Sequence, residues 1–285
     1  MGEKKPVIAI MYDFDKTLCT KDMQEYGFIP SINWTAPKFW AKASSLAQEE
    51  HMDKILAYMY LMIKESKSSE KPIKRENFVT LGGNIEFFNG VEEWFDRITE
   101  YGKEKGVTIE HYIISSGLKE IIEGSKIYKK FKKIYACEFL YEENGLAVWP
   151  KMAVNYTTKT QFLFRINKGV LDISEDEKLN QYVDNDDRPI PFRNMIYIGD
   201  GLTDVPCMKL VKSNGGKSIA VYQARKKKVV AKLLNDKRVD FIAPADYSDG
   251  KEIDQIVKDV IVKMSIESKL VKLHRKQIHV IQQNI

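Results

Sequence analysis

The sequence predicts an α/β fold, a parallel sheet core that carries a separate group of inserted helices. Short, unbroken apolar runs are typical of strands that are buried on both faces of a parallel sheet. Segments with a helical pattern alternate with these runs, and such alternation indicates a doubly wound core. The predicted strands are 7–12, 111–114, 195–198, 218–222 and 239–243, and the predicted core helices are 91–105, 118–133, 160–168 and 226–235.

Residues 19–87 interrupt the alternation. Apolar side chains recur with helical spacing over 52–63, and a second helical segment precedes them at 37–48. Glycines near residues 82 and 90 supply flexible backbone where the chain would return to the sheet. We therefore expect a helical cap at 19–87 and a core made of 1–18 and 88–285. The apolar stripe of this cap is expected to form the cap's own core: Trp34, Phe39, Trp40, Met52, Met59, Tyr60 and Met62.

Three further segments complete the expected organisation. Residues 136–149 are typical of a hairpin that turns near Asn144-Gly145. The acidic, proline-containing stretch 172–194 is expected to be an exposed loop. A helix is expected from Glu252 within a helical tail at 251–285, whose apolar stripe loses its phase after Met264. Two alternatives therefore remain for the tail after Met264: a second helix, or a contact in an oligomer such as a homodimer.

Composition narrows the class of protein. The chain has 285 residues and is 44% hydrophobic, which excludes a disordered protein because such chains bury too little apolar surface. No apolar run approaches the ~18 residues of a membrane span. The three cysteines are widely spaced and indicate reduced thiols in a cytoplasmic protein rather than a disulfide framework.

The charge pattern gives little sign of a nucleic-acid partner. The chain carries 45 basic and 40 acidic residues, a net charge of +5. Basic residues gather at 126–133 and 225–228, and we interpret both clusters as solvated helix faces, since no recognition motif accompanies them. We expect no nucleic-acid partner and no membrane partner.

Three of the predicted strands run directly into short polar signatures. These are DFDKT at 13–17, SSG at 115–117 and GDGLTD at 199–204. In open α/β sheets the ligand site lies beyond the carboxyl ends of the strands. We therefore expect all three signatures to meet at one edge of the sheet.

The residue types in these signatures indicate phosphoryl chemistry with a metal ion. Asp13, Asp15, Asp200 and Asp204 would gather carboxylates whose mutual repulsion is costly without a cation. Hard oxygen ligands suit Mg²⁺, which commonly also contacts a phosphate. A carboxylate can attack phosphorus, while a hydroxyl, main-chain N–H groups and a lysine hold the phosphoryl oxygens.

The motifs DFDKTL, IISSG and GDGLTD resemble motifs I, II and IV of the haloacid dehalogenase (HAD) superfamily. Their order and spacing are most similar to the phosphoserine-phosphatase-like branch, and the resemblance extends over residues 6–250. It implies a Rossmann-like parallel sheet with a helical C1-type cap after the first strand. It also implies a Mg²⁺-dependent phosphatase that hydrolyses a small phosphomonoester through an aspartyl-phosphate.

The resemblance further implies a role for each motif residue. Asp13 would be the nucleophile, and Asp15 would protonate the leaving oxygen and then deprotonate water. Mg²⁺ would be held by Asp13, by the main-chain carbonyl of Asp15 and by Asp200. Asp204 would orient a metal-bound water or the motif III lysine, and Thr17 would support the motif I loop.

The phosphoryl oxygens would be bound by the SSG turn and by the motif III lysine. Ser115, the N–H of Ser116 and the turn at Gly117 form the first part of this site. Lys159 is favoured as the lysine because it follows the expected hairpin, and Lys168 is the rival. On the substrate side, the resemblance implies that Glu25 is a candidate for the cap glutamate that binds the substrate's amino group in the phosphoserine-phosphatase branch, and its neighbours Asp22, Gln24 and Tyr26 are further candidates for substrate contact.

Other functions remain as alternatives. A HAD-type phosphotransferase or phosphomutase would use the same residues, and a non-catalytic HAD-fold binding protein is an alternative of a different class. A DxD glycosyltransferase site would leave Ser115 and Lys159 unexplained, and a receiver domain would have no helical insertion. Asp15 favours phosphatases and phosphomutases, because dehalogenases lack this carboxylate and P-type ATPases carry threonine there.

Overall fold

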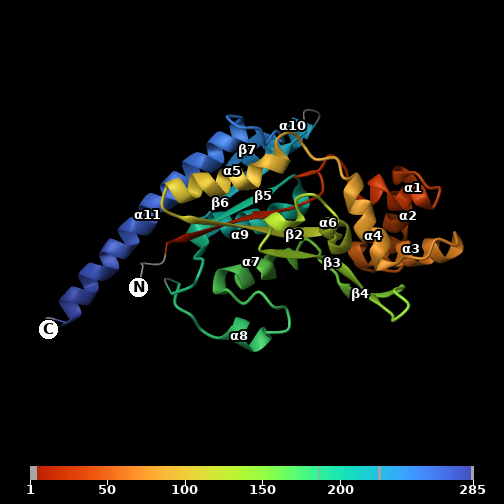
Figure 1. The fold of residues 1–285 in the computed structure, drawn as a ribbon, viewed down its shortest axis with the longest axis horizontal. Coiled ribbons are helices and arrows are strands. Elements are labelled where there is room, and N and C mark those ends of the chain that lie inside the picture. Colours follow the sequence, from red (N-terminus) through yellow and green to blue (C-terminus); the bar gives the residue numbers. More distant parts are fainter. Residues whose placement is uncertain (1–4, 186, 224–225, 284–285) are drawn as a thin grey trace.

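The centre of the computed structural model, which describes residues 5–185, 187–223 and 226–283, is a seven-stranded sheet (Figure 1). The strand order is β4-β3-β2-β1-β5-β6-β7, and all neighbours are parallel except β3 and β4. The predicted parallel core is confirmed. The strands are β1 (Val7–Tyr12), β2 (Thr108–Leu118), β3 (Lys133–Tyr141), β4 (Ala147–Met152), β5 (Met195–Gly199), β6 (Lys217–Tyr222) and β7 (Phe241–Pro244).

Helices cover both faces of this sheet, as its apolar strands require. On one face lie α5 (Val91–Glu104) and α11 (Glu252–Gln283), and on the other lie α7 (Lys159–Lys168) and α9 (Val205–Ser213). α10 (Lys227–Asn235) packs beside β6 and β7. The central strand β1 is fully buried from Ile8 to Tyr12. The DFDKT segment at 13–17, which follows it, is therefore anchored at the edge of the sheet.

A buried polar network ties β1 to β2 and α5. The Tyr12 hydroxyl lies 3.0 Å from Nδ1 of His111 and accepts a hydrogen bond from Nε1 of Trp94 at 2.9 Å. The Thr99 hydroxyl lies 3.1 Å from Nε2 of the same imidazole. Burial lowers the pKa of His111 to about 4, because the ring cannot be hydrated when it is charged.

The helices between β1 and α5 form a group at one end of the sheet (Figure 1). They are α1 (Phe28–Ser31), α2 (Ala36–Glu49), α3 (Lys54–Ser68) and α4 (Arg75–Leu81). Cys19 and Phe87 pair in a single antiparallel bridge, so the chain leaves and re-enters the sheet at one place. Oδ1 of Asp53 accepts hydrogen bonds from the N–H groups of Ile55 and Leu56 in the first turn of α3 and caps that helix. The domain boundaries near residues 18 and 88 stay predictions.

Two segments differ from the sequence-based expectation. The predicted helix 118–133 is only α6 (Lys119–Glu123), followed by a 3₁₀ turn at 128–130. It ends at Gly124, because glycine is disfavoured in helices, and an added Cβ at this position would lie 1.7 Å from the carbonyl oxygen of Val79. The predicted loop 172–194 contains α8 (Asp176–Asn180) and buries Ile190 and Phe192.

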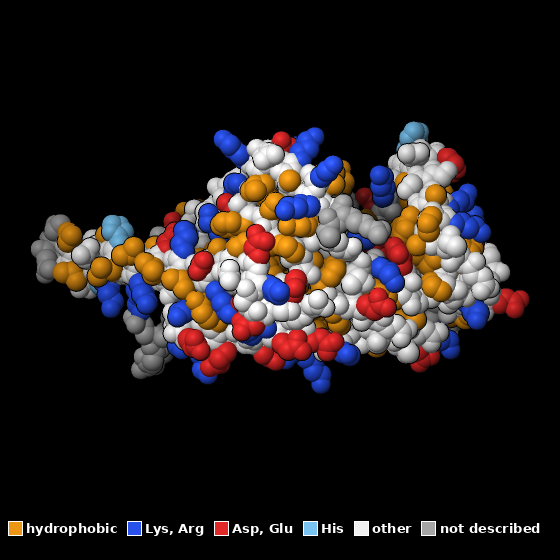
Figure 2. All heavy atoms as spheres, turned by 90° about the horizontal axis from the view of Figure 1, so that it is seen from above, with side chains coloured by type: hydrophobic (Ala, Val, Ile, Leu, Met, Phe, Trp, Pro, Cys, Tyr) orange, Lys and Arg blue, Asp and Glu red, His pale blue; other side chains and the backbone are white. Residues whose placement is uncertain are grey.

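The tail is one 32-residue helix, α11, which projects beyond the sheet (Figure 1). One face of its first half is buried, from Ile253 to Ser265, and most apolar side chains after that point, including Leu270, are exposed (Figure 2). The helix still contacts the body there, since Nδ2 of Asn194 lies 3.4 Å from the Ser268 hydroxyl, so the loss of phase marks where its apolar face is no longer covered. Among the described residues, no helix combines the length and apolarity needed to cross a bilayer.

Candidate active site

The first carboxylates of the site come from a tight turn after β1. Asp13 donates its main-chain N–H to the carbonyl of Ile198 at 2.9 Å, which continues the pairing with β5. The carbonyl of Phe14 then accepts the N–H of Leu18 at 2.9 Å. Within the turn Lys16 has a φ of 59°, a left-handed conformation. This geometry presents the side chains of Asp13 and Asp15 beyond the end of the sheet.

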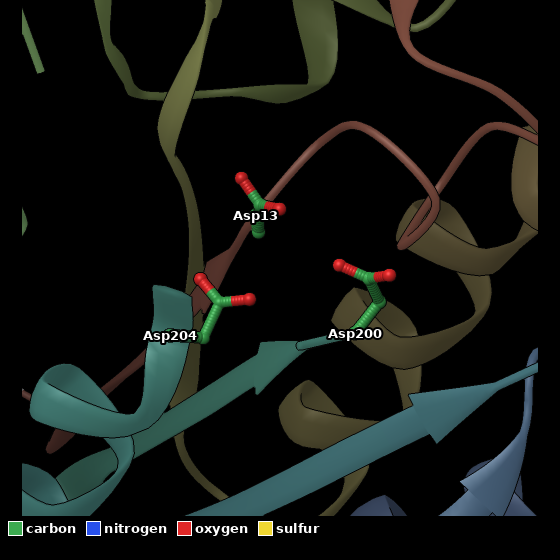
Figure 3. Close-up of side chains that lie close together, drawn as sticks. All are labelled: Asp13, Asp200 and Asp204. Carbon is green, nitrogen blue, oxygen red and sulfur yellow. The ribbon is translucent and has the colours of Figure 1, made fainter. Parts of the chain in front are cut away.

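Three predicted carboxylates converge at this edge (Figure 3). Asp13, Asp200 and Asp204 each offer an oxygen atom, and these atoms lie within 4.8 Å of one another. Burial, opposed by Lys159, raises the pKa of Asp13 to about 6. Burial, followed by repulsion from the two other carboxylates, raises the pKa of Asp200 to about 7. Such an all-oxygen donor set, strained by its own negative charge, fits a hard cation such as Mg²⁺.

Asp15 is not a member of this three-carboxylate group. One of its oxygens accepts the main-chain N–H of Met23 at 2.9 Å. Burial, followed by repulsion from Asp22 and Asp13, holds the pKa of Asp15 well above its usual range. A carboxyl in this environment is suited to carrying a proton. Asp22 forms an ion pair with Lys16 beside it.

Lys159 is brought to the carboxylates, and Lys168 is not. The Lys159 ammonium donates to Asp13 at 2.9 Å and to Asp204 at 2.8 Å, and the side chain is buried. Burial lowers the pKa of this lysine, but the two carboxylates outweigh it and raise the net value above the ordinary one. Asp204 also accepts the hydroxyl hydrogen of Tyr197 at 2.8 Å. Lys168, at the far end of α7, donates to main-chain carbonyls of residues 179 and 181.

The SSG turn, residues 115–117, was expected to follow a strand at 111–114, but it forms the irregular last part of β2 (Thr108–Leu118), where the register with β3 shifts between Ile114 and Leu118. Ser115 is fully buried, and its Oγ accepts the N–H of Gly117 at 3.1 Å. At Gly117, an added Cβ would lie 2.2 Å from Cε of Met23 and 2.9 Å from Oδ2 of Asp15, so a side chain there would displace Met23 and crowd Asp15. Ser115 and Ser116 line the cavity described next, whereas Gly117 does not.

A cavity of about 730 Å³ opens between the strand ends and the inserted helices. The predicted site residues Asp13, Asp15, Lys159 and Asp200 line it. The inserted segment contributes apolar and aromatic side chains, and residues from other segments also line the cavity. Among the further lining residues are Trp40, Met52, Ile55, Tyr58, Asn155, Tyr156, Leu202 and Thr203. This partly corrects the interpretation of the apolar stripe, because Trp40 and Met52 face the cavity while Phe39, Met59 and Met62 are core.

Two of the four substrate-side candidates line the cavity. Asp22 and Gln24 line it, and Glu25 and Tyr26 do not. The Glu25 carboxylate instead accepts the indole N–H of Trp40 at 3.3 Å. Burial, followed by interactions with Asp22, raises the pKa of Glu25. Glu25 is thus placed to orient Trp40 rather than to face the cavity itself.

Several cavity residues were not identified from the sequence. Lys226 belongs to a cluster interpreted as a solvated helix face, yet its ammonium lies 3.6 Å from Asp200 (Arg225, in the same cluster, lies outside the described residues). Lys226 follows β6 closely, so the strand-end argument, extended to a fourth strand, would have found it. Tyr58 gave no such signal, because it reaches the site from a helix in the insertion. The other basic cluster pairs with acids, as in the 3.0 Å contact between Lys126 and Glu92.

Known proteins resemble this chain in sequence or in fold. Over 290 residues the chain is 29% identical to an uncharacterized protein of Borreliella burgdorferi, covering 89% of this chain and 96% of that one. A HAD family hydrolase of Salmonella enterica serovar Typhi is structurally similar, with a TM-score of 0.55, 17% identity, and 87% of this chain and 73% of that chain covered.

A substrate-bound phosphoserine phosphatase also has a TM-score of 0.55, with 16% identity over 90% of this chain and 99% of that chain. At these identities the structures show a common fold. The sequence pattern of the haloacid dehalogenase-like hydrolases matches residues 10–209, which includes both the acidic turn after β1 and the carboxylates that follow β5. The chain belongs to the haloacid dehalogenase-like hydrolases.

Proposed function

We propose that this hydrolase is a Mg²⁺-dependent phosphatase that hydrolyses a small phosphomonoester through an aspartyl-phosphate on Asp13. The observation that supports this most strongly is the meeting of nucleophile, lysine and proton carrier at one cavity. Asp13 is 2.9 Å from the Lys159 ammonium, and Asp15, with its raised pKa, lines the same cavity. The likeness in fold to phosphoserine phosphatases is consistent with this chemistry.

In the first half-reaction the carboxylate of Asp13 attacks phosphorus, and the bond from phosphorus to the leaving oxygen breaks. Asp15 gives its proton to that oxygen, so the leaving group departs as an alcohol. General acid help of this kind is worth roughly 10² to 10⁴ in rate. The N–H of Ser116, the Ser115 hydroxyl and the Lys159 ammonium stabilise the charge on the phosphoryl oxygens.

In the second half-reaction Asp15, now a carboxylate, takes a proton from water. The resulting hydroxide attacks phosphorus, the acyl-phosphate bond breaks, and inorganic phosphate and free Asp13 result. Asp15 then holds the proton needed for the next cycle. Burial, Asp22 and Asp13 all raise its pKa, which favours this proton-holding state between turnovers.

The described residues fit a magnesium ion. Asp13, Asp200 and the main-chain carbonyl of Asp15 would hold it. Asp204 would act indirectly, by orienting Lys159, which donates to it. When bound, Mg²⁺ supplies positive charge that offsets the buried carboxylates and the phosphoryl group. The raised pKa values of Asp13 and Asp200 indicate a site that gains from such a cation.

The wall of inserted helices supports a small substrate. Trp40, Met52 and Tyr58 come from this insertion and line the cavity, so a ligand must enter beneath them. A folded phosphoprotein would be blocked by this wall, whereas a small phosphomonoester delivered by solvent would not. Turnover of a phosphopeptide as fast as the best small metabolite would contradict this part of the proposal.

Hydrolysis of p-nitrophenyl phosphate tests the proposal. The wild-type protein should release nitrophenol with Mg²⁺ and not with EDTA, and Asp13→Asn should reduce kcat by at least about 10³-fold because the nucleophile is lost. Asp249→Asn, an exposed carboxylate on the loop before α11, is the matched control and should be unaffected. If Asp13→Asn retains wild-type turnover, or if neither p-nitrophenyl phosphate nor any small phosphomonoester is cleaved, the proposal is wrong.

A further inference from the structure

The SSG turn is held from outside the sheet by side chains of the inserted segment. The Tyr58 hydroxyl on α3 donates a hydrogen bond to the main-chain carbonyl of Ser116 at 2.8 Å. Met23, in the segment that precedes α1, uses its sulfur to accept the main-chain N–H of Leu118 at 3.0 Å. These two contacts act on two successive peptide groups of the turn.

Peptide planarity transmits the first contact into the site. The C=O of Ser116 and the N–H of Gly117 belong to one planar trans group and point in opposite directions. Because Tyr58 fixes this carbonyl, it also fixes the N–H, which donates to Oγ of Ser115 at 3.1 Å. The orientation of the Ser115 hydroxyl therefore depends on a tyrosine in the insertion. Cys137 also donates to the Ser116 carbonyl at 3.3 Å, but a thiol is a weak donor.

Met23 links this turn to the acidic turn after β1. Its main-chain N–H donates to Asp15 at 2.9 Å, while its sulfur holds the N–H of Leu118. Its methyl group occupies the space that a side chain at position 117 would need. A displacement of Met23 would therefore disturb both the proton carrier and the SSG turn.

We propose that Tyr58 and Met23 are positioning residues, through which the inserted segment holds the SSG turn in the geometry that binds the phosphoryl group. This inference rests on the proposed phosphatase function, since it assigns the turn to phosphoryl oxygens. The insertion then does more than cover the cavity, because its docking also completes the anion site. A substrate would meet a fully formed turn only while these two contacts are in place.

Tyr58→Phe and Met23→Leu test the proposal with little change in shape. The phenyl ring can keep the edge contact with Trp40, whose ring centre lies 5.8 Å away. Tyr60→Phe, on the exposed side of the same helix, and Met59→Leu, in the core of the insertion, are the matched controls. Thermal unfolding of each variant establishes that it is folded, and if Met23→Leu is not, Tyr58→Phe carries the test.

The first readout is binding of inorganic phosphate to the Mg²⁺-loaded protein by calorimetry. Each test variant should bind about 3- to 10-fold more weakly, since losing one hydrogen bond lowers the share of molecules with a formed turn. The same factor should appear in kcat/KM for p-nitrophenyl phosphate and for any other phosphomonoester, because all share the phosphoryl group. Wild-type phosphate affinity in both variants, or a loss confined to one substrate, would overturn the proposal.

The second readout does not depend on catalysis. Amide hydrogen exchange over residues 115–118 of the ligand-free protein should be faster in the test variants than in the wild type and the two controls. If the wild type cleaves no phosphomonoester, the proposed function fails, and this exchange alone decides whether Tyr58 and Met23 hold the turn. Unchanged exchange would overturn the positioning role.

Discussion

Replacing Lys159 by methionine removes an ammonium group that lies between two buried carboxylates and keeps most of the side-chain length. In the wild type its ammonium donates to Asp13 at 2.9 Å and to Asp204 at 2.8 Å. Removing one partner of a buried ion pair costs about 3–5 kcal/mol, because the other is left without compensation. We therefore expect Lys159→Met to lose about that much unfolding free energy at pH 8 in EDTA.

The sign of the pH dependence distinguishes this loss from simple packing damage. Burial, opposed by Lys159, already raises the pKa of Asp13 to about 6, and without the lysine it must rise further. Above pH 6 the folded variant then holds a proton that neither its unfolded chain nor the folded wild type holds. Its stability therefore falls as pH rises, by about 1.4 kcal/mol per pH unit relative to the wild type. Between pH 6 and pH 8 the deficit should grow by up to about 2.7 kcal/mol.

Urea unfolding at pH 6, 7 and 8, always in EDTA, measures this deficit. Lys168→Met is the matched control, because that lysine sits on the same helix but donates only to main-chain carbonyls, and its effect should not vary with pH. A Lys159→Met deficit below about 1 kcal/mol at pH 8, or one equal at all three pH values, would refute the reasoning.

Two further predictions concern a buried histidine of β2 and a glycine of the SSG turn. Burial lowers the pKa of His111 from 6.5 to about 4. As pH falls between these values, the unfolded chain binds a proton and the folded protein does not, so the free energy of unfolding decreases. At pH 5 this loss should be about 2 kcal/mol and should be absent in His111→Gln, measured as the difference between the two urea titrations. Gly117→Ala should lower kcat/KM at least about 100-fold, because its Cβ would lie 2.2 Å from Met23, whereas Gly83→Ala, whose Cβ meets nothing within 4 Å, should not. Equal kcat/KM values for the two alanine variants would contradict the close approach at Gly117.

Local sequence patterns correctly predicted most of the strands of the sheet. The apolar run before Asp13 predicted β1 because a strand buried on both faces must be apolar at every position, and the same logic located β5 and β6. Sequence patterns predicted the length of the helix at 118–133 less well. Gly124 is a local sign of a helix end within 118–133, but its close approach to Val79 joins segments far apart in the chain and is seen only in the structure.

Part of the candidate site could also be predicted from the sequence, and part depends on the tertiary structure. That Asp13, Ser115 and Asp200 would share an edge follows from the sequence alone, because each comes directly after a strand, and parallel strands end together. The choice of Lys159 over Lys168 followed only from its place after the hairpin, and the burial of its ammonium between carboxylates is a tertiary fact.

The sequence by itself therefore determined the α/β class, the order of the motifs and the family, since all three depend on residues close together in the chain. Only the tertiary structure decided which side chains of the insertion reach the strand ends. Tyr58 and Ser116 are 58 positions apart and share no periodic pattern, so their hydrogen bond depends on how the inserted helices dock. Docking is set by the packing of whole surfaces, and no local motif records it.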